Sequence, residues 1–294
     1  MRFFAALIIY TCAAFAEDAQ PTSAVTEIPF DRLSDRALTA LGQKALQVRP
    51  GEWRHAESEH FIYHFFDRPM ASVVSVEAEF SYRVIATELG KDTSAWERKC
   101  HLFLFDDAED WKAFQKFGGL DPWTGGIHSE GALFVRRNPG WKSENGALPH
   151  EITHLVIYRF FGPGIPLWLN EGFAEYASAR CRASFFRARG YSAKPRANTV
   201  KDEHYVPVAD LTGAMGYPVE KERVVAFYEE SQKLVRFLCA ADRAGFLTFL
   251  DSMGKGARFE TAARNHFGNR FLNLEAVERE FKGYATSPLI PTTP

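Results

Sequence analysis

The chain reads His-Glu-Ile-Thr-His at residues 150–154 and Trp-Leu-Asn-Glu-Gly-Phe-Ala-Glu-Tyr at residues 168–176. On a helix, His150 and His154 lie one turn apart on one face, so both imidazoles can reach a single Zn²⁺ at about 2.0–2.1 Å. Glu151 lies beside that position without being a natural ligand, which suits a general base. The third ligand must come from elsewhere, and Glu171 is the candidate. Three protein ligands leave a fourth position open for water, as in a catalytic zinc site.

The second block is expected to form a helix that supports the metal. Glu171 and Glu175 are four residues apart, so both carboxylates line one face of that helix. With Glu171 as ligand, Glu175 can accept the free N–H of a zinc-bound histidine and fix its ring; the alternative is a solvated surface carboxylate. Gly172 is expected to let the two helices approach closely. Pro149 suits a first helical turn, so the first helix starts late or is kinked there.

These two blocks resemble the gluzincin metallopeptidases, and specifically the peptidase MA-like group of secreted bacterial proteins. The second block is also similar, nearly residue for residue, to aminopeptidases of the aminopeptidase N type. A metzincin is not indicated, because positions 157 and 160 are isoleucine and phenylalanine where that family has glycine and histidine. The resemblance covers about residues 52–285 and implies a zinc peptidase. It implies one Zn²⁺ per chain on His150, His154 and Glu171, with Glu151 as general base.

The resemblance extends to a later helix that supplies a tyrosine. Residues 228–231 read Tyr-Glu-Glu-Ser and precede an apolar stripe, which is similar to the helix that carries the transition-state tyrosine of those aminopeptidases. The match implies that Tyr228 donates its hydroxyl to the oxyanion of the tetrahedral intermediate. The alternative is a core or rim tyrosine on an amphipathic helix. Tyr205 and Tyr217 compete for the same role.

The same resemblance implies a function for the apolar run at 132–135. In gluzincins the edge strand next to the active helix binds the substrate backbone as an additional strand, and this run is expected to be that strand. Aminopeptidases place an acidic residue just before it to bind the substrate's amino terminus. Glu130 is the acidic residue in range, although the family's amine-binding motif is not matched around it. Glu130 is therefore a weakly supported substrate-binding residue.

The first sixteen residues have the pattern of a secretion signal. Arg2 supplies positive charge, an apolar stretch follows, and residues 14–16 read Ala-Phe-Ala, a small-x-small cleavage site. Anchoring as a lipoprotein through Cys12 is disfavoured, because Tyr10 and Thr11 are poor residues ahead of such a cysteine. No later segment has 18 uninterrupted apolar residues, so no transmembrane segment is expected. A secreted or periplasmic protein of the bacterial envelope is therefore predicted.

The order of apolar runs and helical stripes predicts an α+β protein. Its architecture is expected to be gluzincin-like, with an N-terminal mixed sheet-and-helix lobe to about residue 160, a C-terminal helical lobe, and the His-Glu-x-x-His helix between them. Strands are expected at 61–66, 100–105 and 132–135, and the first helices at 31–47 (capped by Asp31), 71–89 and 107–117. Further helices are expected from Leu167 onward and at 221–241, 242–252, 257–267 and 273–283.

The chain is divided into a signal peptide (1–16), an N-terminal extension (17–52), a peptidase MA-like domain (53–285) and a disordered tail (286–294). Within the domain, the chain after Tyr176 is rich in arginine, with five up to residue 196. The periodic pattern of apolar residues is lost over 191–220. That stretch is interpreted as a cleft wall or lid, or as an ordinary surface connection. An arginine there could bind a substrate carboxylate. The five arginines are Arg180, Arg182, Arg187, Arg189 and Arg196.

Charge and cysteine content limit the partners. The formal net charge of the chain is −2, which gives no reason to expect nucleic acid or an anionic membrane as partner. Signal removal would leave three cysteines, so at most one disulfide and one free thiol. Cys100 is expected to be a buried apolar residue. A bridge between Cys181 and Cys239 is possible, although no spacing pattern supports it.

The sequence thus predicts a secreted zinc-dependent peptidase that acts on a peptide or protein substrate. Two other functions remain open. One is a zinc-bearing binding protein of the bacterial envelope that has lost turnover. The other is a zinc hydrolase of a non-peptide amide, since its chemistry at the metal would be the same.

Overall fold

A computed structural model gives the structure of the chain. The residues it describes are 25–92, 98–122, 124–137, 147–188, 190 and 205–286. The expected signal peptide with Cys12, residues 191–204 at the start of the 191–220 stretch and the tail from 287 onward lie outside them. Among the described residues, no helix is both long and apolar enough to span a membrane.

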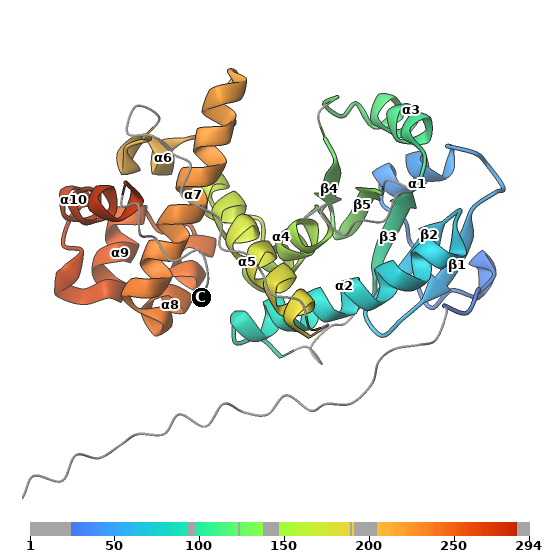
Figure 1. Ribbon diagram of the computed structural model, residues 1–294, viewed down its shortest axis with the longest axis horizontal. Coiled ribbons are helices and arrows are strands. Elements are labelled where there is room, and N and C mark those ends of the chain that lie inside the picture. The colour runs from blue at the N-terminus through green and yellow to red at the C-terminus, as the bar shows by residue number, and fades with distance from the viewer. Residues whose placement is uncertain are drawn as a thin grey trace, which may run out of the picture.

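A mixed sheet occupies the first half of the fold (Figure 1). Its strand order is β1-β2-β3-β5-β4, with β2, β3 and β5 parallel and the two outer strands antiparallel to their neighbours. The strands are β1 (Arg54–Glu57), β2 (Phe61–Phe65), β3 (Cys100–Phe105), β4 (Gly126–Ser129) and β5 (Ala132–Arg136). The α+β class is therefore confirmed.

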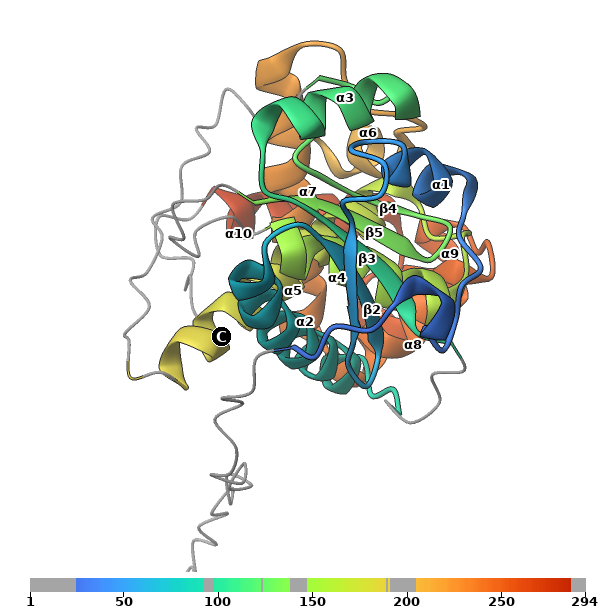
Figure 2. The same ribbon diagram turned by 90° about the vertical axis from the view of Figure 1, so that its right-hand side faces the viewer.

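The sheet separates two apolar cores. All residues of β2 and β3 are buried, as expected for strands covered on both faces. On one face, Phe61 and Tyr63 pack in the core that includes α2 (Arg68–Glu88). On the other face, Phe103 packs in the core that includes α1 (Ala40–Leu46) and α3 (Ala108–Gly118). Figure 2 shows α2 and α1 on opposite sides of the strands.

Helices make up the rest of the described chain, beyond the sheet. They are α4 (Ala147–Phe161), α5 (Leu167–Arg187), α6 (Val208–Gly213), α7 (Lys221–Ala241), α8 (Arg243–Gly254), α9 (Phe259–Phe267) and α10 (Leu274–Ala285). Figure 1 places α4 and α5 between the sheet and the group α7 to α10. The close approach permitted by Gly172 is to α7 and not to α4, because a Cβ there would lie 2.4 Å from the Ser231 carbonyl oxygen. Any side chain at 172 would separate α5 from α7.

The expectation of one helix over 31–47 was wrong. A short 3₁₀ turn covers Phe30–Arg32, and α1 begins only at Ala40, with the Thr39 hydroxyl accepting from Gly42 N at 3.0 Å. Between them, Asp35 accepts from the backbone N–H of Ala37. Such local side-chain-to-backbone bonds compete with helix formation.

The expected edge strand was also wrongly assigned. The run at 132–135 forms β5, but β5 lies inside the sheet, and β4 is the edge strand. β4 was missed because its four half-buried residues include a glycine and two polar residues and lack a strand pattern. It forms by pairing with β5 across a two-residue turn, in which Glu130 and Gly131 have positive φ values of 50° and 81°. Positive φ values are typical of two-residue hairpin turns, and glycine adopts them most readily.

All three cysteines in the described chain are free and buried. Cys100 lies in β3, as expected for a small apolar residue, and the Cys181–Cys239 bridge does not form. The Cys181 thiol contacts the Ser81 carbonyl oxygen instead, at 3.7 Å.

Three histidines form a hydrogen-bonded row across β1, β2 and β3. His55 Nδ1 lies 2.8 Å from His64 Nδ1, and His64 Nε2 lies 2.9 Å from His101 Nδ1. Burial lowers the pKa of all three, in His55 to about 4, and the neighbouring imidazoles lower it further in His55 and His64. Around His101, Asp35 and Glu57 raise its pKa while Arg98 lowers it. The surroundings of the row therefore favour the neutral form of all three imidazoles.

We expect this row to make the fold sensitive to acid. In the unfolded chain His55 is protonated below its ordinary pKa of 6.5, whereas in the folded protein its pKa is about 4. Protonation therefore favours the unfolded chain between these pH values, and stability present at pH 7 is lost as the pH falls. For His55, half-buried and partly screened, the loss between pH 7 and pH 5 is about 1 kcal/mol. Urea unfolding at both pH values measures it. His55→Asn, which retains a polar group near Nδ1, should reduce the loss by that amount; an equal loss in both proteins would contradict the expectation.

Candidate metal centre

Three side chains from α4 and α5 converge at the contact between these helices. His150 and His154 project from one face of α4, and Glu171 projects towards them from α5. Pro149 lies in the first turn of α4, which leaves the helix regular through both histidines. The two helices pack side by side (Figure 1), so the ligand spacing in each helix becomes a three-dimensional cluster.

The distances among the three ligand atoms fit a zinc ion. His150 Nε2 and His154 Nε2 are 3.0 Å apart, and Glu171 Oε2 lies 3.3 Å from the first and 3.5 Å from the second. Tetrahedral ligands at 2.0–2.1 Å from zinc are separated by about 3.3 Å. Glu171 Oε2 is buried and has no hydrogen-bond partner, although buried carboxylate oxygens are normally satisfied. A cation bound by the three atoms would satisfy it.

Each histidine is held from its other ring nitrogen. His154 Nδ1 lies 3.0 Å from Asn170 Oδ1, and His150 Nδ1 lies 3.1 Å from Glu175 Oε1. Both acceptors favour the tautomer in which Nδ1 carries the proton and Nε2 is free for a metal. Asn170 was missed in the sequence, although its position directly before Glu171 was a usable signal. The side chains of α5 thus provide one candidate ligand and hold the rings of the other two.

The electrostatics of the cluster favour a bound cation. Burial works to lower the pKa of His150, but the adjacent carboxylates of Glu171 and Glu175 outweigh it and raise that pKa to about 10. Burial works to raise the pKa of Glu171, yet both histidines bring it well below its usual range. The carboxylates therefore attract positive charge to this position, as protons or as a metal ion.

Glu151 lies next to the edge strand of the sheet. It is 8 % exposed, and burial raises its pKa. A Cβ at Gly126 in β4 would lie 2.9 Å from Glu151 Oε1, so a glycine is required for β4 to approach the carboxylate this closely. The position beside two metal ligands and a raised pKa suit a group that accepts and returns protons.

The three candidate tyrosines occupy different positions. The Tyr217 hydroxyl donates to Glu171 Oε1 at 2.5 Å. The Tyr228 ring stacks on that of Tyr217, with centroids 6.0 Å apart, and its centroid lies 6.5 Å from that of His150. Burial and then the negative charge of Glu171 raise the pKa of both phenols, so both stay protonated donors at neutral pH. The Tyr205 hydroxyl instead donates to Glu278, at 2.7 Å.

The structure places Glu130 in the exposed turn between β4 and β5. Its contact with a substrate amino terminus remains a prediction. His128, on β4, lies nearer the cluster: burial lowers its pKa to about 3, and His154 lowers it further. Its Nε2 accepts from Gly131 N at 3.3 Å, so this ring stabilises the hairpin turn.

Within the described residues, a second group with metal-ligand geometry consists of Glu59, His60 and Glu79. Glu79 there already accepts from the His60 backbone N–H at 2.9 Å and from Ser58 Oγ at 2.5 Å, and its other oxygen contacts His60 Nδ1 at 2.6 Å. With its carboxylate satisfied, this group lacks the free ligand atom found at Glu171.

Comparisons with known proteins add no assignment. No family model matches the chain, and no curated protein matches its sequence.

Removing the hydrogen bond that Asn170 Oδ1 accepts from His154 Nδ1 should weaken metal binding. In Asn170→Ala, His154 loses the acceptor that fixes its ring and tautomer, and the affinity for Zn²⁺ should fall by about 10- to 100-fold. Competition with a chromophoric chelator at pH 7 measures the dissociation constant. Asn265→Ala, at an exposed position of α9, is the matched control and should bind zinc as tightly as the wild type. Unchanged affinity in Asn170→Ala would show that this contact does not position the ligand.

Proposed function

We propose that this protein is a secreted, zinc-dependent peptidase of the gluzincin type. The observation that carries the proposal is the triangle formed by His150 Nε2, His154 Nε2 and Glu171 Oε2, with edges of 3.0–3.5 Å, beside the buried Glu151. Three protein ligands and an adjacent general base are the requirements of metal-assisted hydrolysis. Secretion is proposed from the signal-like first sixteen residues.

The residues of the cluster divide the chemistry between them. When bound, zinc acts as a Lewis acid that polarises the scissile carbonyl and lowers the pKa of a water. Glu151 accepts the proton of the attacking water on its carboxylate and returns it to the departing amine. A buried carboxyl group with a raised pKa performs both transfers near neutral pH more readily than an exposed one.

The proposed substrate-binding element is the edge strand. Among the described residues, β4 pairs only with β5, and it lies against α4 next to Glu151. A peptide that adds to the free edge of β4 would align its backbone along the strand through main-chain hydrogen bonds. The role expected for the run at 132–135 passes to β4, and a scissile carbonyl on that path would lie near the metal ligands.

The two alternatives make different predictions for turnover. A silent binding protein would hold zinc but release no product, whereas the buried Glu151 next to the ligands favours an active site. A hydrolase of non-peptide amides would use the same residues, and no feature of the described residues favours it over a peptidase. Digestion of a broad peptide library by the zinc-loaded protein distinguishes these possibilities.

We expect peptide cleavage that a chelator abolishes and added zinc restores. Glu151→Gln should retain stoichiometric zinc and lose activity by about 10²- to 10⁴-fold, because the base is removed while the ligands stay. Mass spectrometry of the digest and atomic absorption of the protein give the two readouts. Full hydrolysis by Glu151→Gln, or a library left intact by zinc-loaded wild type, would refute the proposal.

Tyr228 and Tyr217 should affect different quantities. Tyr228 is the proposed oxyanion donor, so Tyr228→Phe should lower kcat by about a hundredfold or more while KM and zinc content stay nearly unchanged. Tyr217 donates to a metal ligand, so Tyr217→Phe should chiefly weaken zinc affinity. Steady-state kinetics at saturating zinc separate the two effects. A fully active Tyr228→Phe alongside a Tyr217→Phe crippled at saturating zinc would transfer the donor role to Tyr217.

A further inference from the structure

Arg182 has no ion-pair partner among the described residues, and it lies on the same helix face as the candidate metal ligand Glu171. Glu171, Glu175 and Arg182 are separated by four and seven residues, which places all three on one face of α5. The other two described arginines of this helix have partners. Arg180 forms an ion pair with Glu88 at 2.8 Å, and Arg187 donates to Ser184 Oγ at 3.3 Å.

Arg182 is half-buried, and no carboxylate lies within 4.0 Å of its guanidinium in the part of the chain that the structure describes. A half-exposed guanidinium that has no carboxylate partner among the described residues keeps its donors available for an anionic ligand.

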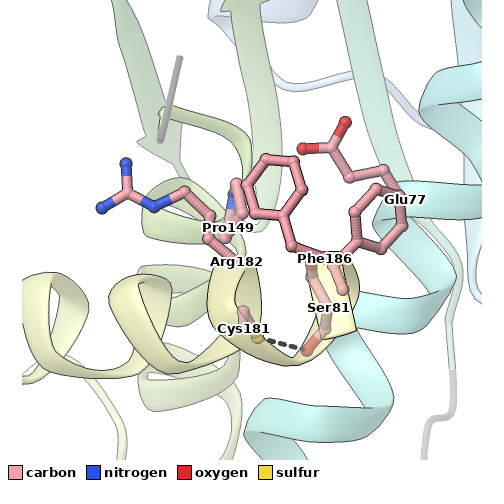
Figure 3. A pocket seen from close by; sticks show the side chains of 7 residues that line it. Glu77, Ser81, Pro149, Cys181, Arg182 and Phe186 are labelled. Atoms are coloured by element: carbon pink, nitrogen blue, oxygen red, sulfur yellow. Dashed lines mark hydrogen bonds between the residues drawn. The ribbon is translucent and has the colours of Figure 1, made fainter. Parts of the chain in front are cut away.

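A small apolar hollow, open to solvent, lies beside Arg182 and next to α4. Pro149, the residue before the ligand His150, lines it together with Phe185 and Phe186 of α5. Figure 3 shows the Arg182 side chain beside Pro149, with its guanidinium turned away from Phe186. The acidic residue of the hollow, Glu77, is neutralised by a buried ion pair with Arg137. Within the described part of the chain, Arg182 is thus the charged residue beside the hollow without an ion-pair partner.

We infer that Arg182 binds the C-terminal carboxylate of the peptide substrate, with the apolar side chain of the last residue packed against the apolar surface around the hollow. Arginine binds carboxylates through two parallel hydrogen bonds, and the proline and phenylalanine rings suit an apolar side chain. This inference rests on the proposed peptidase function. It makes the enzyme one that removes short fragments from the C-terminal end of peptides.

The helix geometry limits the length of the fragment. Eleven residues separate Glu171 from Arg182, about 16 Å along the axis, and side chains lean towards the helix N-terminus, so the guanidinium lies roughly 10 Å from the metal ligands. An extended peptide covers about 3.3–3.6 Å per residue. The scissile bond should therefore lie two or three residues from the carboxylate.

The test compares two N-acetylated peptides of one sequence that end in phenylalanine, one with a free carboxylate and one amidated. Zinc-loaded Glu151→Gln protein should bind the free acid about 10- to 100-fold more tightly than the amide by calorimetry. Arg182→Met in that background should bring the ratio close to one, and Arg182→Lys should retain part of it. Arg187→Met, the matched control on the same helix, should retain the full ratio. Zinc content is measured in each variant to verify the folded site.

Wild-type digests should release fragments of two or three residues from the free acid. Equal cleavage of acid and amide, or a ratio that survives in Arg182→Met, would overturn the inference and leave the peptidase function standing. A preference for an internal glutamate in amidated peptides would also overturn it. Absence of any cleavage, with neither peptide bound, would overturn both the inference and the proposed function.

Discussion

The burial of Glu171 between α4 and α5 is the constraint on which the site depends. A carboxylate 4 % exposed is stable only if positive charge lies close to it. Two histidines one turn apart on α4 face it, and Tyr217 satisfies one of its oxygens. The other oxygen is left without a hydrogen bond, at a distance from both imidazoles that suits a shared metal ion. The packing of α4 against α5 therefore brings together the three atoms that could hold a metal ion.

The remaining elements hold this arrangement from both sides. On one side, the contact between Gly172 and the Ser231 backbone fixes α5 against α7, the helix that carries Tyr228. On the other side, the β4–β5 hairpin brings Gly126 against Glu151. The glycine at this point of the short edge strand lets β4 lie directly against the Glu151 carboxylate. The candidate ligands, candidate general base and candidate oxyanion donor thus come from three helices, α4, α5 and α7, and their geometry depends on the packing of those helices.

The sequence predicted the features that depend on local periodicity. His150 and His154 at helical spacing, and Glu171 with Glu175, fall on α4 and α5 as expected, and the strands at 61–65 and 100–105 are confirmed. The edge strand β4 could not be predicted, since its strand conformation depends on pairing with β5 and not on its own residues. The contacts of Asn170 and Tyr217 were missed because they depend on packing between helices. The start of α1 was also predicted wrongly, because local hydrogen bonds near Asp35 compete with helix formation there.

The most direct test of the central claim is X-ray absorption at the zinc edge of the metal-loaded protein. We predict one zinc ion per chain with two imidazole nitrogens at about 2.0–2.1 Å, oxygen ligands completing the shell and no sulfur. Loss of one imidazole in His154→Ala would assign the signal to this centre. A shell that contains sulfur, a spectrum unchanged in that variant, or the absence of stoichiometric zinc would contradict the account.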